Sequence, residues 1–183
     1  PCPLPTPSLG TSPTPPNGIL NTRGMELAFI KVGGFSISGI TNAITYRLSS
    51  TNKWLHLTTI PHIEQCNFGT AVLGNQLYVV GGCFNQSLQE NIHPFGFCYS
   101  PQGDKWSTMS PMLRGRCRFT LTVVGEKLYA VGGEAEESSL AGAECEVYNP
   151  NEDIWSQVPG LPCLRAQHAA AALDTHLYVL GGL

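Results

Sequence analysis

The chain is poor in charge. Asp, Glu, Lys and Arg make up 13% of its 183 residues, against about 25% in an average globular domain. With 42% hydrophobic residues, this excludes a disordered chain and a helical bundle rich in Glu and Lys. Ten basic residues against thirteen acidic ones leave a net charge of −3 and no basic surface for nucleic acid.

Membrane and export signals are also lacking. No apolar run approaches the roughly 18 residues of a membrane span, so we expect no membrane contact. The first twenty residues lack the basic start and apolar core of a signal peptide. A single glycosylation sequon, Asn85-Gln86-Ser87, is the one sign of secretion, and a chain of this length has one by chance.

Metal-binding and catalytic spacings are absent as well. The seven cysteines are odd in number and contain no CxxC pair, which argues against a zinc site and a disulfide framework. We interpret them as reduced thiols of a cytoplasmic chain, most of them filling the core. The five histidines show no HxxxH spacing. We therefore expect no metal, no cofactor and no enzymatic activity.

Prolines are concentrated at the N-terminus. Seven of the fourteen fall in the first sixteen residues, separated by Ser, Thr and Gly. This composition predicts a disordered linker over residues 1–24, with ordered structure from near Met25.

The remainder of the chain repeats. Double glycines recur at spacings of 48, 51 and 49 residues, and tryptophans at spacings of 52 and 49. A period of 40–50 residues is typical of propeller blades. The glycine pairs are Gly33-Gly34, Gly81-Gly82, Gly132-Gly133 and Gly181-Gly182, and the tryptophans are Trp54, Trp106 and Trp155.

Each repeat contains four short strand patterns. In the second unit they cover about residues 67–73, 76–82, 95–100 and 105–109. Turn pairs such as Gly74-Asn75 join the first two strands in tight hairpins. The sequence therefore predicts an all-β fold of four-stranded antiparallel sheets that pack radially against one another.

Three columns of the repeat have a structural interpretation. The glycine pairs allow sharp turns and close approach of neighbouring backbone. Arg116 and Arg165 stand sixteen residues before a glycine pair, and we expect them to donate to nearby backbone carbonyls. His168 occupies the position of Phe68 and Phe119, so packing explains it.

The combined pattern resembles the kelch repeat over about residues 25–183. The shared features are Arg-x-x-(His/Phe), Leu-Tyr-x-x-Gly-Gly, Tyr-x-Pro and Trp. The first unit departs most, with Lys31 inside its strand, and the second has Gln65 where Arg is expected. The resemblance implies kelch-type β-propeller blades at 25–60 (lacking the first strand), 61–110, 111–160 and, in part, 161–183. About three and a half blades cannot close a propeller of the usual six, so we expect a fragment.

The resemblance also implies a ligand-binding face. In kelch proteins, ligand peptides meet residues just after the double glycine and just before the first strand. Mapped here, the first set is Phe35, Cys83, Asn85, Glu134 and Glu136, and the second is Asn67, Arg118 and Gln167. Phe84 could anchor the long 83–94 loop, and Arg114 lies near Arg118. For the acidic residues a solvated loop, and for Cys83 an inert packing role, are the structural alternatives.

Kelch-like proteins commonly join a BTB domain, a BACK segment and a propeller that binds protein substrates for cullin-RING ubiquitin ligases. The resemblance therefore implies a protein-interaction module, with a cullin bound only through a BTB domain that is absent here. A cytoskeletal, actin-binding role is the alternative. An enzyme of the galactose-oxidase kind is the third possibility, and the chain offers no matching ligand pattern.

Overall fold

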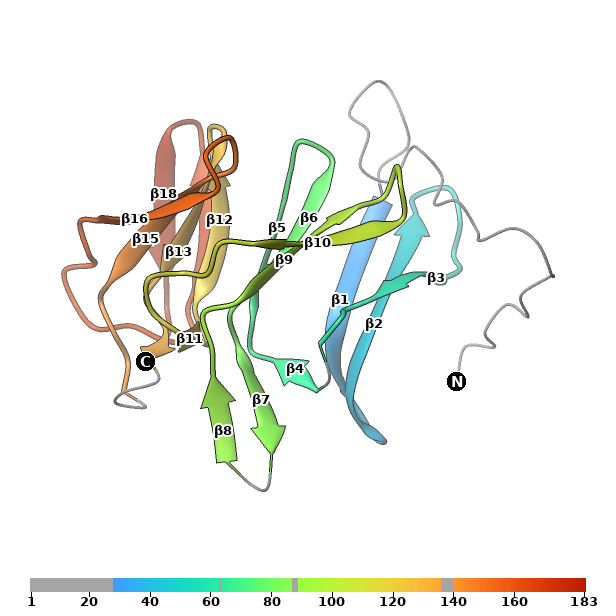
Figure 1. Ribbon diagram of the computed structural model, residues 1–183, viewed down its shortest axis with the longest axis horizontal. Helices are drawn as coiled ribbons and strands as arrows, with labels where there is room; N and C mark the ends of the chain where they lie inside the picture. The colour runs from blue at the N-terminus through green and yellow to red at the C-terminus, as the bar shows by residue number, and fades with distance from the viewer. Residues whose placement is uncertain (1–27, 63, 87–88, 136–139) are drawn as a thin grey trace.

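Strands are the only regular elements in the described part of the chain, and they form sheets that stand side by side (Figure 1). The computed structural model describes residues 28–183 apart from 63, 87–88 and 136–139, and only the backbone of 36, 85, 86, 89 and 90. The predicted linker at 1–24 lies outside these residues. Within them, no helix is long and apolar enough to span a membrane.

The two central sheets have the four antiparallel strands that the sequence predicts. The second sheet consists of β5 (Gly69–Leu73), β6 (Gln76–Val80), β9 (Gly96–Ser100) and β10 (Lys105–Met109). The third consists of β12 (Thr120–Val124), β13 (Lys127–Val131), β15 (Cys145–Asn149) and β16 (Ile154–Val158). Both pair in the order first, second, third, fourth strand, so the all-β, four-stranded prediction is confirmed. We call these sheets blade two and blade three.

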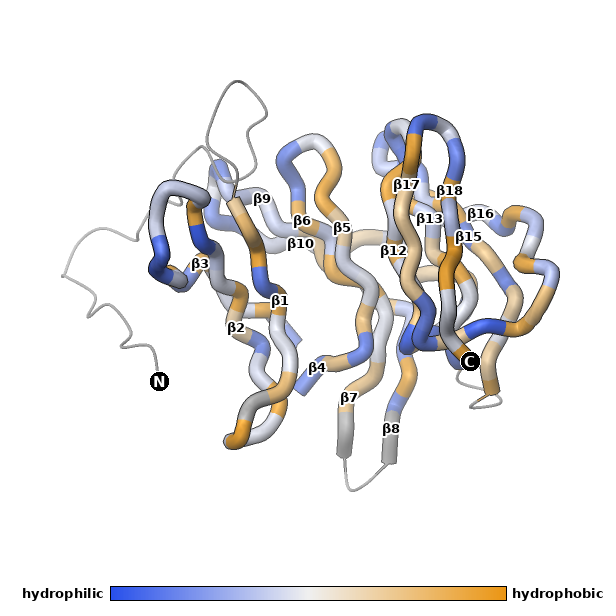
Figure 2. The backbone as a smooth tube through the Cα atoms, turned by 180° about the vertical axis from the view of Figure 1, so that it is seen from behind, coloured by the Kyte–Doolittle hydropathy of each residue, from blue (hydrophilic) through white to orange (hydrophobic). Residues whose placement is uncertain are grey.

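The first sheet has three strands, β1 (Ala28–Ser36), β2 (Gly39–Leu48) and β3 (Leu55–Thr59). Unlike the later units, β1 continues through Gly33-Gly34 and turns directly into β2, with a register shift between Val32 and Gly34. The tip of this hairpin is hydrophobic, whereas the turn between β17 and β18 is hydrophilic (Figure 2). Ile37 at the tip is fully exposed.

The last sheet is the pair β17 (Ala169–Leu173) and β18 (His176–Leu180). Strands β5, β12 and β17 are the first strands of their sheets, and β12 contacts both of the others. These first strands therefore line the inside of the arc, as radial packing requires.

Apolar side chains fill the spaces between sheets. One cluster joins blades two and three through Tyr78, Met112, Phe119, Tyr148 and Trp155, and a second joins the first sheet to blade two. Each blade tryptophan also donates a hydrogen bond to the preceding sheet. Trp155 Nε1 donates to the Ser110 carbonyl at 2.9 Å, and Trp106 Nε1 to Thr58 Oγ1 at 3.2 Å.

The glycine pairs sit where backbones converge. A Cβ on Gly82, whose φ is +91°, would lie 2.4 Å from the Cys66 carbonyl oxygen of the same blade. A Cβ on Gly81 would lie 2.8 Å from the Arg116 carbonyl oxygen at the entry to the next blade. One glycine thus allows close approach within a blade and the other between blades, as the sequence predicts.

The long connection at 83–94 contains regular structure that the sequence analysis does not predict. Its strands β7 (Cys83–Gln86) and β8 (Gln89–Ile92) pair as a hairpin. The short strand β4 (Gln65–Cys66) extends this hairpin into a three-stranded sheet. In blade three, β11 (Arg116–Cys117) pairs with the short β14 (Glu134–Ala135), and Glu134 forms a further bridge to Ala141.

Candidate functional site

The segments that enter each blade and those that follow each glycine pair lie on one side of the molecule. This side carries β4, β7, β8 and β11 at the bottom of Figure 1, and we call it the loop face. Nine of the ten candidate contact residues from the sequence belong to these segments or lie near the tip of the β1–β2 hairpin, and the tenth, Glu136, is not among the described residues.

A backbone ladder brings three of these candidates together. Arg118 N–H donates to the Asn67 carbonyl at 2.9 Å, and Gln167 N–H donates to the Arg118 carbonyl at 2.9 Å. All three have left-handed backbone conformations, with φ of +56°, +54° and +55°. Consecutive blades thus present one residue each to a common axis.

A cavity of about 360 Å³ opens beside this ladder. Its lining consists of Asn67, Phe68, Arg118, Phe119, Gln167 and His168. The Arg118 guanidinium is held by Glu134, whose Oε2 accepts from Nη1 at 2.6 Å. Both side chains of this ion pair are partly exposed, so they are within reach of a ligand. We call this cavity the axial pocket.

His168 forms the C-terminal wall of the axial pocket. Its Nε2 lies 3.0 Å from Thr120 Oγ1 in the neighbouring blade. Burial, and then the positive charge of Arg165, hold the pKa of His168 below its ordinary value. The ring is therefore neutral at pH 7 and packs as the sequence predicts from its column.

Other sequence candidates lie elsewhere. Cys83 is fully buried against Cys66, with the two Sγ atoms 3.6 Å apart, so its predicted contact with a ligand is corrected to a packing role. Phe84 is half-buried, and Phe35 is 69% exposed near the separate hairpin tip. Glu136 and the side chain of Asn85 lie outside the described structure.

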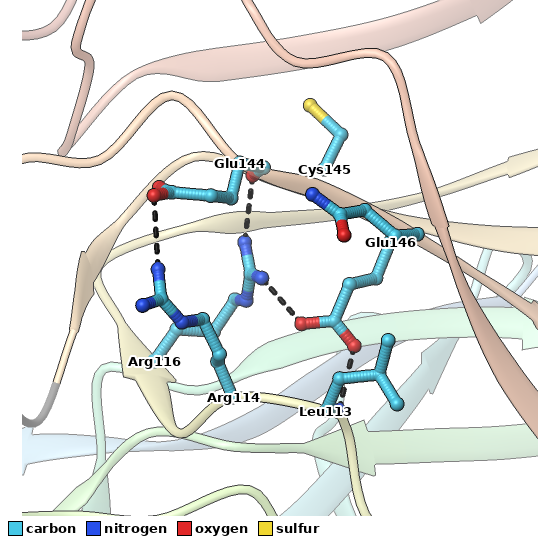
Figure 3. Close-up of a pocket in the computed structure, with 7 residues that line it drawn as sticks. Leu113, Arg114, Arg116, Glu144, Cys145 and Glu146 are labelled. Carbon is cyan, nitrogen blue, oxygen red and sulfur yellow. Dashed lines mark hydrogen bonds and ion pairs between the residues drawn. The ribbon is translucent and has the colours of Figure 1, made fainter.

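A second cavity, of about 410 Å³, lies in blade three (Figure 3). Leu113, Arg114, Arg116, Glu144, Cys145, Glu146 and Gln157 line it. Arg114 pairs with Glu144 at 2.9 Å near the surface, and Arg116 pairs with Glu146 at 2.5 Å in the interior. The sequence pointed to Arg114 alone among these residues as a contact.

Arg116 is a structural residue. Its Nη1 donates to the carbonyls of Gly132 and Glu144, at 2.9 and 2.8 Å. Arg165 donates in the same way to Gly181, and Gln65 donates to Gly81 at 2.7 Å. The prediction that this column binds backbone carbonyls is confirmed.

The sequence analysis did not identify Glu144 and Glu146, the acidic partners of Arg114 and Arg116 in blade three. Glu146 also accepts from the Leu113 N–H at 2.7 Å, and Glu144 has a lowered pKa because its own backbone N–H and Arg114 stabilise the carboxylate. Neither glutamate belongs to a repeated column. The sequence did contain one indication of these glutamates: blade two has Phe95 and Phe97 at the positions of Glu144 and Glu146, so the chemistry of this place differs between repeats.

Within the described residues, no group of three or more His, Cys, Asp or Glu side chains could hold a metal ion. The Arg118–Glu134 and Arg114–Glu144 pairs instead give this part of the molecule charged and hydrogen-bonding groups. Such a surface offers hydrogen bonds and shape to a binding partner.

Comparison with known families agrees with this architecture. The Kelch motif matches residues 66–113 and again 115–162, which together make up more than half of the chain. The chain belongs to the kelch-repeat family. The two matched segments correspond to blades two and three, and the expected kelch-type propeller fold is confirmed.

Several curated proteins are similar in sequence. Kelch-like protein 33 of Homo sapiens is 35% identical over 136 residues, covering 74% of this chain and 25% of that protein. Kelch-like protein 26 of Danio rerio is 37% identical over 116 residues, 61% of this chain and 18% of the relative. The Kelch repeat and BTB domain-containing protein 2 of cowpox virus is 27% identical over 135 residues, covering 73% of this chain and 23% of that protein. The chain thus spans a quarter or less of these relatives.

A solved structure supports the same fold. The structure titled "Structure of YjhT" superposes with a TM-score of 0.70 at 17% identity. The match covers 80% of this chain and 52% of that one. The kelch chain described here thus corresponds to about half of that fold.

Proposed function

We propose that this kelch chain is a protein-recognition module that binds a partner through its loop face. The observation that carries the proposal is the axial ladder, which places Asn67, Arg118 and Gln167 side by side at a pocket mouth. Rigid sheets behind it fix their positions, and loops on rigid scaffolds are where proteins place recognition residues. The remaining candidates, Phe35, Phe84, Asn85, Arg114, Glu134 and Glu136, would contribute from the surrounding segments.

Arg118 is the anchor in this proposal. Its side chain is partly exposed, it lines the axial pocket, and Glu134 holds it in one orientation. Arginine is enriched among residues that dominate interface energies. The mixed lining, with Phe68 and Phe119 beside polar groups, suits a peptide segment that presents both apolar and polar side chains.

Loss of Arg118 should weaken partner binding. We expect Arg118→Ala to cost about 1–2 kcal/mol, or about five- to thirtyfold in Kd, without a comparable loss of folding stability. Lys127→Ala is the matched control, because Lys127 is an exposed cation at the start of β13, next to the β12–β13 turn and away from the loop face (Figure 1). Titration calorimetry with a captured partner measures both. Equal affinity for Arg118→Ala and wild type would reject the proposed site.

We further propose that the module serves a cytoplasmic substrate adaptor of a cullin-RING ubiquitin ligase and is not itself an enzyme. One relative is named for a BTB domain beside its kelch repeats, and such a domain would bind the cullin. Co-precipitation of the full-length protein with a cullin tests this role. Saturable co-sedimentation with actin, without a cullin, would favour the cytoskeletal alternative instead.

A further inference from the structure

Blade two carries a cluster of aromatic and imidazole rings on the loop face. Its members, which we call the aromatic cluster, are His62, Phe84, His93, Phe95 and Phe97. Ring centroids lie 5.1 Å apart for His62–Phe84, 5.4 Å for His62–His93 and 5.7 Å for His93–Phe95. His93 is buried beneath, whereas Phe95 is 55% exposed. The cluster therefore reaches from the interior to the surface.

The corresponding place in blade three is occupied by ion pairs. Phe97 pairs across the sheet with Val79 of β6, and Glu146 pairs in the same way with Ala130 of β13. Blade two thus has Phe97 where blade three has Glu146, and Gln65 where blade three has Arg116. Blade two therefore has no guanidinium at the position of Arg116, and aromatic rings surround the equivalent residue, Gln65.

One glutamate near the aromatic cluster in sequence has no ion-pair partner among the described residues. On the described loop face of blade three, each glutamate is paired with an arginine: Glu134 with Arg118, Glu144 with Arg114 and Glu146 with Arg116. Glu64 lies two residues from His62, is exposed, and forms no ion pair among the residues that the structure describes. An aromatic face attracts a cation, and so does an exposed carboxylate.

Buried polar atoms near the aromatic cluster also favour a cation over an anion. Gln65 is the cross-strand partner of Phe84, and its Oε1 is buried with no hydrogen-bond donor among the described residues. Both ring nitrogens of His93 are buried and unpartnered in the same part of the chain. Burial, and then the neighbouring His62, lower the pKa of His93 to about 4, so the ring is uncharged at pH 7 and does not repel a cation.

We propose that the aromatic cluster of blade two, together with Glu64, binds an arginine side chain of the partner. The guanidinium would stack on Phe95 and His62 and pair with the Glu64 carboxylate. Arginine fits better than lysine, because its planar group stacks on a ring and bonds a carboxylate at the same time. The proposal rests on the partner-binding role of the loop face and adds the chemistry of one contact.

Titration of the isotope-labelled full chain with capped tripeptides tests the contact by NMR. The probes are Gly-Arg-Gly, Gly-Lys-Gly, Gly-Leu-Gly and Gly-Glu-Gly. We expect saturable shifts of the Phe95 and His62 signals with the arginine probe, weaker ones with lysine and none with glutamate. Shifts of equal size with the leucine probe, or none with arginine, would overturn the proposal.

Variants localise the effect. Phe95→Ala and Glu64→Gln should each weaken the arginine probe about two- to fivefold, the scale of one exposed cation–π or ion-pair contact. Leu113→Ala is the matched control, because Leu113 is the exposed residue of blade three that corresponds to His62. Unchanged affinity in both test variants would contradict the contact. A partner that needs Arg118 but not Phe95 or Glu64 would overturn this inference and leave the proposed function standing.

Discussion

Blades two and three have the same strand arrangement and differ in the side chains that pack within it. In blade three, the exposed Arg114 pairs with Glu144 and the buried Arg116 pairs with Glu146. In blade two, Gln65 and a set of aromatic rings occupy the corresponding place. At this place in the blade, the shared feature is the contact of the Gln65/Arg116 side chain with a glycine carbonyl. The residues around that contact can form an ionic network or an apolar cluster, so one blade can differ from the next in the surface that it presents.

The largest difference is expected when the column residue is removed. Arg116→Met should lower the free energy of unfolding by about 3–5 kcal/mol, because it leaves Glu146 buried without its cation. Gln65→Met should cost only about 1–2 kcal/mol, since it removes a neutral hydrogen bond to Gly81. Urea unfolding followed by tryptophan fluorescence measures both values.

A double variant provides the control for this comparison. Arg116→Gln with Glu146→Phe gives blade three the side chains of blade two and removes both buried charges, so it should regain much of the stability lost in Arg116→Met. Equal losses for Gln65→Met and Arg116→Met would mean that the two blades are stabilised alike and would contradict the expected difference.

The two blades should also differ in their response to pH. His93 in blade two has a folded-state pKa of about 4 against an ordinary value of 6.5. The unfolded chain thus binds the proton more readily, and unfolding free energy should fall as pH drops from about 6.5 to about 4, by at most about 1.4 kcal/mol per unit. Glu144 and Asp153 in blade three have lowered pKa values, so their contributions are lost only at more acidic pH.

Stability of the full chain measured by urea unfolding between pH 7 and pH 4 tests this difference. His93→Phe should flatten the curve over that range. His168 also has a lowered pKa and contributes with the same sign, so some slope should remain. A variant curve parallel to wild type would show that His93 is not the titrating group.

The smallest effect should be the same in both blades. Tyr99 donates to Asp104 at 2.8 Å, and Tyr148 donates to Asp153 at 2.7 Å. Tyr99→Phe and Tyr148→Phe should each cost about 1 kcal/mol, the value of one hydrogen bond. Thermal unfolding of the two variants side by side is the measurement. A clear difference between them would mark these tyrosines as part of what distinguishes the blades.

The features that recur in every repeat could be predicted from the sequence. The strands, the glycine contacts and the carbonyl bonds of Arg116 and Arg165 recur at one period, so each unit supports the reading of the next. The hairpin at 83–92 was missed, because its length occurs in one unit only.

The site was harder to predict for the same reason. Asn67, Arg118 and Gln167 belong to one column, and the structure brings them together as neighbours. Glu146 and the aromatic cluster occupy equivalent positions with opposite chemistry, so the repeat pattern averages them away. Cys83 was misplaced because a short strand pairs it with Cys66 and buries it, which spacing alone does not reveal.

Site-specific photo-crosslinking tests most directly whether the loop face is the binding surface. A photoreactive phenylalanine analogue would replace the exposed Phe95 on the loop face in one full-length variant and Glu126 in the β12–β13 turn in another. We expect partner proteins to be captured from position 95 and not from position 126. Capture from position 126 alone would place the binding surface on the opposite side of the blades and contradict the central claim.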